Sequence, residues 1–253
     1  MDASELRGYW DVAIAEGLTG QEPRQTRPRL QQWFSSYRST GRGQVTTEGF
    51  PEPNIGSLPG GATRPRVVML GLNPGAQDVA FQAADGIFAD EIRQMGSYSA
   101  WAASGPYRRA LWTTIKGPNV YHNRRLAFGQ RWTADPTLTD GELLTMELYP
   151  WHSTAVTGTM APDPAIISEL VWEPIADADV ETVTAFGKPW VRTAEKLGLP
   201  SRLLDVPFTV PSRRVRAYDL PSGRRLIVLW YSGSADPPNS TDVEVLRLSL
   251  HQS

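Results

Sequence analysis

Hydrophobic positions along the chain form two kinds of pattern, short continuous runs and helical stripes. The runs at residues 67–72, 143–149, 180–186 and 225–231 predict strands buried on both faces. Each run ends in residues typical of turns, and helical patterns follow most of them. Strands that alternate with helices are typical of a parallel sheet covered by helices. We therefore expect an α/β protein, a three-layer α/β/α sandwich around a mainly parallel four-stranded sheet.

Apolar residues spaced three and four apart predict helices in the rest of the chain. These helices are expected over residues 4–16, 28–37, 86–95, 105–116, 119–133, 163–172 and 241–250, with one more after Gly187. A Leu-Pro-Ser-Gly turn between 206–219 and 225–231 predicts a hairpin. Residues 40–65 hold many Gly and Pro and predict a long structured loop that could wrap the mouth of a site. No repeat or domain boundary is visible, so we expect one domain over 1–253.

Composition narrows the class of protein. The 253 residues are 40% hydrophobic and 21% charged, which is ordinary for a globular protein. No apolar stretch approaches the length of a membrane span, and the N-terminus lacks a secretory signature, so we expect a cytoplasmic protein without a membrane partner. Cys is absent and only three His are present, so we expect no disulfide, no metal site and no cofactor.

The candidate chemistry lies at the end of the first run, which reads R-V-V-M-L-G-L-N-P-G from Arg66 to Gly75. In open α/β sheets ligands bind at the carboxyl ends of strands, where Asn73 would lie. Gly71 and Gly75 lack side chains, so another molecule could approach the backbone closely. A strand-ending turn without a further role is the alternative. The glycines fit neither a dinucleotide-binding motif nor a P-loop.

The G-L-N-P-G segment resembles the first motif of the uracil-DNA glycosylase superfamily, particularly its mismatch-specific and single-strand-selective branches. The resemblance implies that Asn73 positions a hydrolytic water. It also implies that Gly71, Leu72, Pro74 and Gly75 help to enclose a flipped base, within a catalytic core at 66–240 that follows N-terminal helices and the wrapping loop at 1–65.

Other features of the superfamily have candidate counterparts. An aromatic residue downstream of the first motif stacks on the base there, which suggests Phe88 or Phe81, although Phe at helical spacing is also typical of a core. The superfamily reads the base with an Asn near the end of the second strand. Here no Asn is present, and the candidates are Glu147, Tyr149, His152 and Ser153; His152 could instead tie loops together.

DNA contact is expected from a local basic rim, because a net charge of −2 gives no global basic footprint. Arg213, Arg214 and Arg216 are candidates, and Lys188 could meet a phosphate, although such residues also occur on solvated faces. The loop Ser232-Gly233-Ser234 corresponds in position to the superfamily's second motif but departs from its His- or Asn-led Pro-Ser pattern. Its backbone amides could still bind a phosphate.

The resemblance leads us to expect a monomeric, monofunctional DNA glycosylase that flips a nucleotide and hydrolyses the bond between base and sugar. No lysine stands in the first motif, so lyase chemistry is not expected. Two other classes stay open: an enzyme of nucleotide metabolism on the same fold, and a non-catalytic module that binds nucleic acid.

The hydrogen-bonding capacity of Glu147 indicates which base the protein would bind. An ionised carboxylate only accepts hydrogen bonds, and it pairs with the exocyclic amine of cytosine rather than with the carbonyl of uracil. The loops at 40–65 and 232–235 could leave room for a bulky substituent. We therefore expect a modified cytosine, for example the glucosylated hydroxymethylcytosine of some phages, and a role in antiviral defence. Uracil excision in DNA repair, which the resemblance by itself favours, is the alternative.

Overall fold

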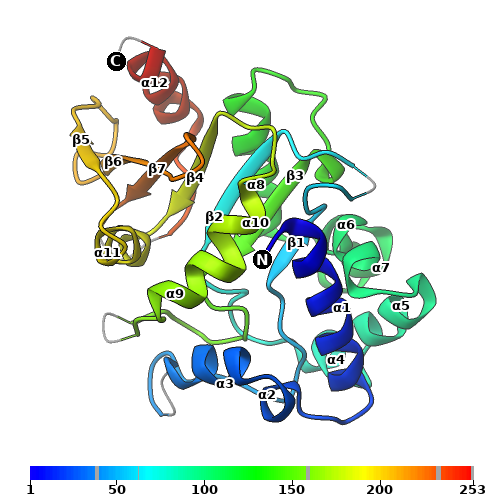
Figure 1. Cartoon of the computed structure of the whole chain (residues 1–253). Coiled ribbons are helices and arrows are strands. Elements are labelled where there is room, and N and C mark those ends of the chain that lie inside the picture. Colours follow the sequence, from blue (N-terminus) through cyan, green and yellow to red (C-terminus); the bar gives the residue numbers. More distant parts are fainter. Residues whose placement is uncertain (38–39, 62, 158–159, 232–234, 252–253) are drawn as a thin grey trace.

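A seven-stranded mixed sheet forms the centre of the protein, seen in a computed structural model that describes residues 1–37, 40–61, 63–157, 160–231 and 235–251 (Figure 1). The strand order is β1-β3-β2-β4-β7-β6-β5. The strands are β1 (Asn54–Gly56), β2 (Val67–Gly71), β3 (Leu143–Glu147), β4 (Thr182–Phe186), β5 (Ser201–Leu204), β6 (Arg214–Asp219) and β7 (Arg225–Trp230). The expected α/β class is confirmed.

The expected sheet of four strands is too small. The four predicted strands do pair in parallel, as β3, β2, β4 and β7. Three antiparallel strands extend this unit: β1 beside β3, and β6 and β5 beyond β7. β1 is three residues long within the Gly- and Pro-rich loop, and most of β5 is exposed, so neither carries a continuous apolar run. The predicted hairpin is present as β6 and β7.

Twelve α-helices surround the sheet within the described ranges. They are α1 (Ala3–Leu18), α2 (Pro23–Thr26), α3 (Pro28–Ser35), α4 (Val79–Gln82), α5 (Ile87–Met95), α6 (Tyr98–Ala103), α7 (Ala110–Lys116), α8 (Val120–Trp132), α9 (Pro164–Ile167), α10 (Glu173–Ile175), α11 (Lys188–Lys196) and α12 (Ser240–His251). A π-helical stretch, Ser168–Trp172, joins α9 to α10. The helix expected over 105–116 is divided, because Arg109 is extended and separates a 3₁₀ turn (Pro106–Arg108) from α7.

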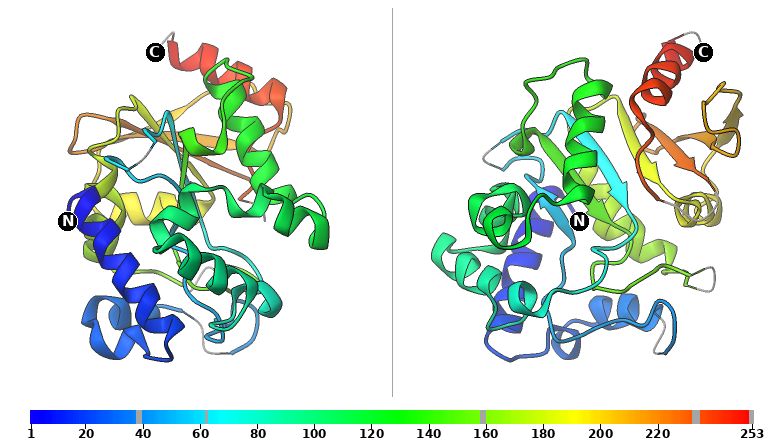
Figure 2. Two further views of the ribbon diagram at one scale, coloured as in Figure 1. Left: turned by 90° about the vertical axis from the view of Figure 1, so that its right-hand side faces the viewer. Right: turned by 180° about the vertical axis from the view of Figure 1, so that it is seen from behind.

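Helices cover both faces of the sheet (Figure 2). Alternate residues of β2 point to opposite sides, so Val68 and Leu70 belong to one hydrophobic cluster and Val67 and Met69 to another. The first cluster includes residues of α1, α3, α5, α6, α9 and α11, and the second includes residues of α8 and α12. The N-terminal helices therefore share a core with the central strands.

The chain leaves β2 in a way that creates a crevice at the carboxyl edge of the sheet. It passes through α8 to reach β3 on one side of β2, and then through α9 and α10 to reach β4 on the other side. Such reversal points are the usual ligand sites of open α/β sheets. Asn73 lies two residues beyond β2, at this edge. Within the described part of the chain, no helix has the length and apolarity needed to cross a membrane.

Candidate functional site

A cavity of about 470 Å³ opens at the carboxyl end of β2. This volume is within the range of about 300–1,000 Å³ that small-molecule sites occupy. One side is the loop that follows β2, and the opposite side comes from the segment around α7 and the start of α8. The lining residues are Asn73, Pro74, Gly75, Ala76, Gln77, Asp78, Gln82, Tyr107, Trp112, Asn119, Tyr121 and His122.

The amide of Asn73 is oriented by the loop after β3. Its Nδ2 donates to the backbone carbonyl of Ser153 at 2.5 Å and lies 3.1 Å from the Ser153 hydroxyl. A carbonyl oxygen only accepts, so the amino half of the amide must face Ser153. The Oδ1 atom has no hydrogen-bond partner among the described residues and is left to accept a hydrogen from a water molecule or a ligand.

The two glycines of the G-L-N-P-G segment have different roles. Gly75 has a φ of +87°, which favours glycine, and the space around it is open. A Cβ on Gly71 would lie 2.2 Å from Glu147 Oε2 and 2.6 Å from Arg125 Nη2. Gly71 therefore makes room for two buried side chains of the same chain. Leu72 packs against Gly187 and, like Gly71, does not line the cavity.

Glu147 lies behind the cavity wall, next to the end of β2. Its Oε1 accepts a hydrogen bond from the Tyr121 hydroxyl at 2.8 Å, and that hydroxyl accepts one from Arg125. Burial raises the pKa of Glu147 to about 7, against the opposing effect of Arg125; Glu52 raises this pKa further and His152 lowers it. Tyr121 lines the cavity and Glu147 does not, so the carboxylate expected to read a base is covered.

A second buried carboxylate, Glu52, binds two residues that line the cavity. Its Oε1 accepts hydrogen bonds from the Tyr107 hydroxyl at 2.5 Å and from Gln82 Nε2 at 2.9 Å. His152 Nε2 lies 3.6 Å from the same oxygen, and the residue is 1% exposed. His152 therefore packs beneath the site, and it does not line the cavity.

The aromatic wall differs from the one expected. Phe81 and Phe88 are both fully buried, with ring centroids 5.0 Å apart. They do not line the cavity but pack behind two residues that do, Trp112 and Tyr107. Tyr107 and His122 line the cavity instead, with rings 4.3 Å apart and nearly parallel at 7°. Burial lowers the pKa of His122 to about 3, so this ring is neutral at pH 7. Trp112 and Tyr121 complete the wall.

The expected DNA-facing residues are dispersed. Lys188 is exposed just after β4, and Arg214 is exposed opposite Trp230 at the carboxyl end of β7. Arg213 is buried, with its Nε 3.5 Å from Asp242 Oδ2. Arg216 pairs with Val228 in the sheet and forms an ion pair with Glu195 of α11. Ser232, Gly233 and Ser234 lie outside the described residues.

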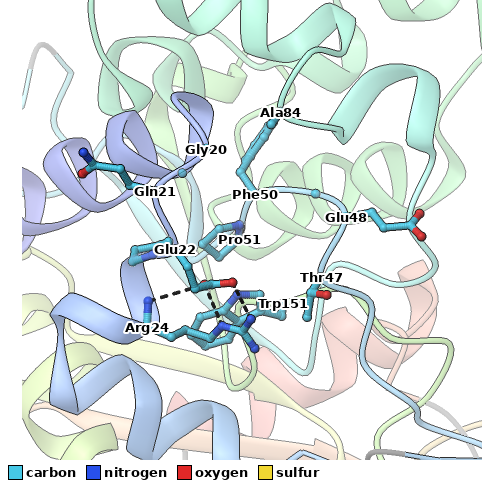
Figure 3. A pocket seen from close by; sticks show the side chains of 13 residues that line it. Gly20, Gln21, Glu22, Arg24, Thr47, Glu48, Phe50, Pro51, Ala84 and Trp151 are labelled. Atoms are coloured by element: carbon cyan, nitrogen blue, oxygen red, sulfur yellow. Dashed lines mark hydrogen bonds and ion pairs between the residues drawn. The ribbon is translucent and has the colours of Figure 1, made fainter.

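A second cavity, of about 200 Å³, lies between the α1–α2 turn and residues 47–51 (Figure 3). Glu22 and Arg24 point into it and bind each other, with Arg24 Nε donating to Glu22 Oε1 at 2.7 Å. The two charged side chains of this cavity therefore bind each other and are not left free for a ligand. The cavity at β2 remains the stronger candidate for a functional site. Where the chain is described, no three His, Asp or Glu side chains are grouped as metal ligands would be.

Several residues of the site were missed from the sequence: Glu52, Gln77, Gln82, Tyr107, Trp112, Tyr121, His122 and Arg125. One signal was present for two of them. Tyr121 and Arg125 are four residues apart, so they lie on the same face of the helix and their side chains can contact each other. Gln77 follows the G-L-N-P-G segment directly, but nothing local distinguishes it from a surface glutamine.

Comparisons of the chain with models of protein families, with curated proteins and with solved structures gave no match.

Proposed function

We propose that this protein is a monofunctional DNA glycosylase that hydrolyses the bond between a flipped base and its sugar. The observation that carries the proposal is the amide of Asn73, held by Ser153 with Oδ1 unpartnered by any described residue at a strand-end cavity. The resemblance of residues 71–75 to the first motif of the uracil-DNA glycosylase superfamily supports the same assignment. With it we propose that the chain has the three-layer α/β/α fold of that superfamily.

In the proposed reaction Asn73 Oδ1 accepts a hydrogen bond from a water molecule and holds it beneath the sugar. The carbon–nitrogen bond breaks and the base departs with its electron pair. The water oxygen bonds to the oxocarbenium-like carbon and loses a proton to solvent, and the base gains one. A water that attacks such a cation needs little activation, so positioning can supply much of the rate enhancement.

The cavity suits a flat ring. Tyr107, His122, Trp112 and Tyr121 supply aromatic side chains, and stacking on a base contributes about 1–3 kcal/mol. His122 is neutral at pH 7 because burial lowers its pKa to about 3, so the wall near it carries no imidazolium charge. We propose that this wall, rather than Phe81 or Phe88, holds the base.

The proposed partner is DNA, bound by a monomer. Lys188 and Arg214 are the exposed basic side chains among those expected to contact it, and both lie at the carboxyl edge that carries Asn73. Because Arg213 is buried against Asp242 and Arg216 pairs with Glu195, we assign these two to the fold.

For the target we propose a modified pyrimidine, either a modified cytosine of phage DNA in a defence role or uracil in repair. The carboxylate argument for cytosine loses its geometric support, because Tyr121 lies between Glu147 and the cavity. The cavity volume of about 470 Å³ suits a substituted base, but none of the lining residues comes from the loop at 40–65 that was expected to make room for it.

The test is base release from oligonucleotides. Single- and double-stranded DNA containing uracil, hydroxymethylcytosine or its glucosylated form is incubated with the protein, and freed bases are identified by mass spectrometry. We expect one base to be released and Asn73→Ala to lower the rate at least ~100-fold. Asn123→Ala, which removes an exposed amide on α8, is the matched control and should retain full activity.

Full activity of a folded Asn73→Ala variant would overturn the catalytic assignment. Release from free nucleosides but not from DNA would favour an enzyme of nucleotide metabolism. Binding of DNA without any base release would favour a non-catalytic module.

A further inference from the structure

Most polar side chains that line the cavity at β2 are bound within the fold or shielded from solvent. Some form hydrogen bonds or ion pairs with other residues of the chain, and the polar atoms of the others have no accessible surface. These side chains are Gln77, Asp78, Gln82, Tyr107, Trp112 and Tyr121. Apart from Asn73, whose Oδ1 holds the water in the proposed reaction, this leaves Asn119 and His122 at the start of α8.

Asn119 is the N-cap of α8, and this position orients its amide. Its Oδ1 accepts a hydrogen bond from the backbone N–H of His122 at 3.2 Å. A backbone N–H only donates, so the oxygen of the amide must face the helix and Nδ2 must face away from it. Nδ2 has no hydrogen-bond partner among the described residues and, unlike the amide of Gln77, is not shielded from solvent. Asn119 therefore offers a hydrogen-bond donor to the cavity.

The ring of His122 is held flat against Tyr107, with centroids 4.3 Å apart and 7° between the planes. Tyr107 is itself fixed, because its hydroxyl donates to Glu52 at 2.5 Å and accepts from Gln82 Nε2 at 2.6 Å. The stacking covers one face of the imidazole and leaves its edge uncovered. Neither ring nitrogen of His122 has a partner in the described part of the chain, and neither is shielded from solvent. The edge of this ring is therefore positioned by the fold but not used by it.

The protonation state of His122 determines what this edge can bind. Burial and the charges of Arg125 and Arg108 lower its pKa to about 3, so the ring is neutral at pH 7. A neutral imidazole carries one N–H donor and one acceptor nitrogen. Together with Asn119 Nδ2, the start of α8 offers two donors and one acceptor without a net charge. Such a set suits the edge of an uncharged heterocycle better than a phosphate or a carboxylate.

We propose that Asn119 and His122 bind the polar edge of a pyrimidine, with Asn119 Nδ2 donating to a ring carbonyl and His122 bonding through its ring nitrogens. A ring of the same shape without this edge would leave these polar atoms unpaired once it excludes water, so the site would reject it. The inference rests on the proposed function for the identity of the occupant. It assigns the reading of the base to the start of α8 in place of Glu147.

The test compares rings of the same shape and needs no hydrolysis. 1-Methyluracil has carbonyl oxygens at positions 2 and 4, whereas 2,4-difluorotoluene carries fluorine there and is a poor hydrogen-bond acceptor. 1-Methylcytosine keeps the carbonyl at position 2 and has an amine at position 4, so the tighter of the two pyrimidines is the base that the site prefers. Binding of each probe to the full chain is measured by ligand-observed NMR titration. We expect the preferred pyrimidine to bind the wild type at least ~10-fold more tightly than 2,4-difluorotoluene.

Two conservative variants separate base reading from support of the fold. Asn119→Asp keeps an oxygen at the N-cap of α8 and removes the donor, and His122→Phe keeps a ring against Tyr107 and removes the nitrogens. Each should lower the preference for the pyrimidine at least ~5-fold without lowering the melting temperature. Asn123→Asp is the matched control, the same substitution at an exposed residue of the same helix, and should keep the wild-type preference.

Equal affinity of the wild type for the pyrimidines and 2,4-difluorotoluene would overturn the proposal, as would no binding of any probe at millimolar concentration. An unchanged preference in either variant would remove the role of that residue.

The same titration on Asn73→Ala distinguishes this inference from the proposed activity. That variant should discriminate between the probes as the wild type does. Discrimination without any base release from DNA would remove the glycosylase proposal and leave the pyrimidine site. Base release that is unchanged in Asn119→Asp and His122→Phe would remove this inference and leave the glycosylase.

Discussion

At the scale of single residues, the environment of each side chain decides its chemistry. Asn73 and Gln77 are both amides in one loop, but Ser153 fixes the first and no described residue satisfies the second. Glu147 and Glu52 are both buried carboxylates, and each is covered by a tyrosine that faces the cavity. The cavity is therefore lined by the Asn73 amide and aromatic rings, and the two carboxylates lie behind the tyrosines.

Glu147 is predicted to make stability depend on pH. Its pKa is about 7 in the folded protein, against an ordinary value of 4.5, because burial disfavours the ionised form. Between these values the folded state holds a proton that the unfolded state has lost, so stability falls as pH rises from about 4.5 to 7 and then levels off. The Glu147→Gln side chain cannot ionise. The unfolding free energy of this variant should therefore rise relative to that of the wild type as pH increases from 4.5 to 7, by on the order of 3 kcal/mol in total.

The measurement is urea unfolding of both proteins at a series of pH values. A difference in unfolding free energy that widens from pH 4.5 to pH 7 supports the raised pKa. Parallel pH profiles of the two proteins would show that Glu147 ionises normally.

At the scale of elements, close packing of α8 against β2 and β3 builds the inner wall of the site. Tyr121 and Arg125 extend from one face of α8 towards Glu147, the last residue of β3. The last residue of β2, Gly71, pairs in register with Glu147. Its missing side chain is what allows the carboxylate and the guanidinium to lie there.

Gly71→Ala should destabilise the protein by about 1–3 kcal/mol, the usual cost of forcing an extra methyl group into a packed interior. The new Cβ would lie within 2.6 Å of both Glu147 and Arg125. Gly8→Ala is the control, because Gly8 is exposed in α1 with nothing within 4 Å of an added Cβ. Thermal unfolding should show the control stabilised by up to about 1 kcal/mol, since Ala favours helix.

An unchanged melting temperature of Gly71→Ala would mean that Glu147 and Arg125 rearrange freely. That outcome would also argue that Gly71 is not required for packing. It would instead favour the expectation that Gly71 lets another molecule approach the backbone.

At the scale of the whole molecule, the two edges of the parallel strands are not equivalent. The carboxyl edge carries Asn73, Lys188 and Arg214. The amino edge carries Arg64, which is exposed just before β2 and forms an ion pair with Asp179. With a net charge of −2, DNA binding would depend on such local placement rather than on overall charge.

Lys188→Ala and Arg214→Ala should each weaken the salt dependence of DNA binding. Every lost phosphate contact lowers the slope of log K against log salt by about 0.7–0.9. The slope is measured by fluorescence anisotropy with a labelled oligonucleotide, in Asn73→Ala protein that does not turn over. Arg64→Ala removes an exposed arginine from the opposite edge and should leave the slope unchanged; equal effects of all three substitutions would exclude this orientation.

Much of the fold could be predicted because its signals are local. A strand buried on both faces needs a continuous apolar run, and the runs at 67–72 and 143–149 correspond to β2 and β3. β1 and β5 could not be found this way: β1 is only three residues long, and most of β5 is exposed to solvent. For short edge strands the pairing partner, rather than the sequence, determines the structure.

The sequence by itself determined the α/β class, the parallel core and the place of Asn73 at its carboxyl edge, because apolar runs and turn residues act locally. Only the tertiary structure decided which side chains reach the cavity. Gln77, Trp112 and Tyr121 line the cavity but come from separate segments of the chain. Phe88 is instead fully buried in the core, where it packs against Trp101. Burial and charge at Glu147 depend on those long-range contacts, and a residue's own sequence surroundings do not specify them.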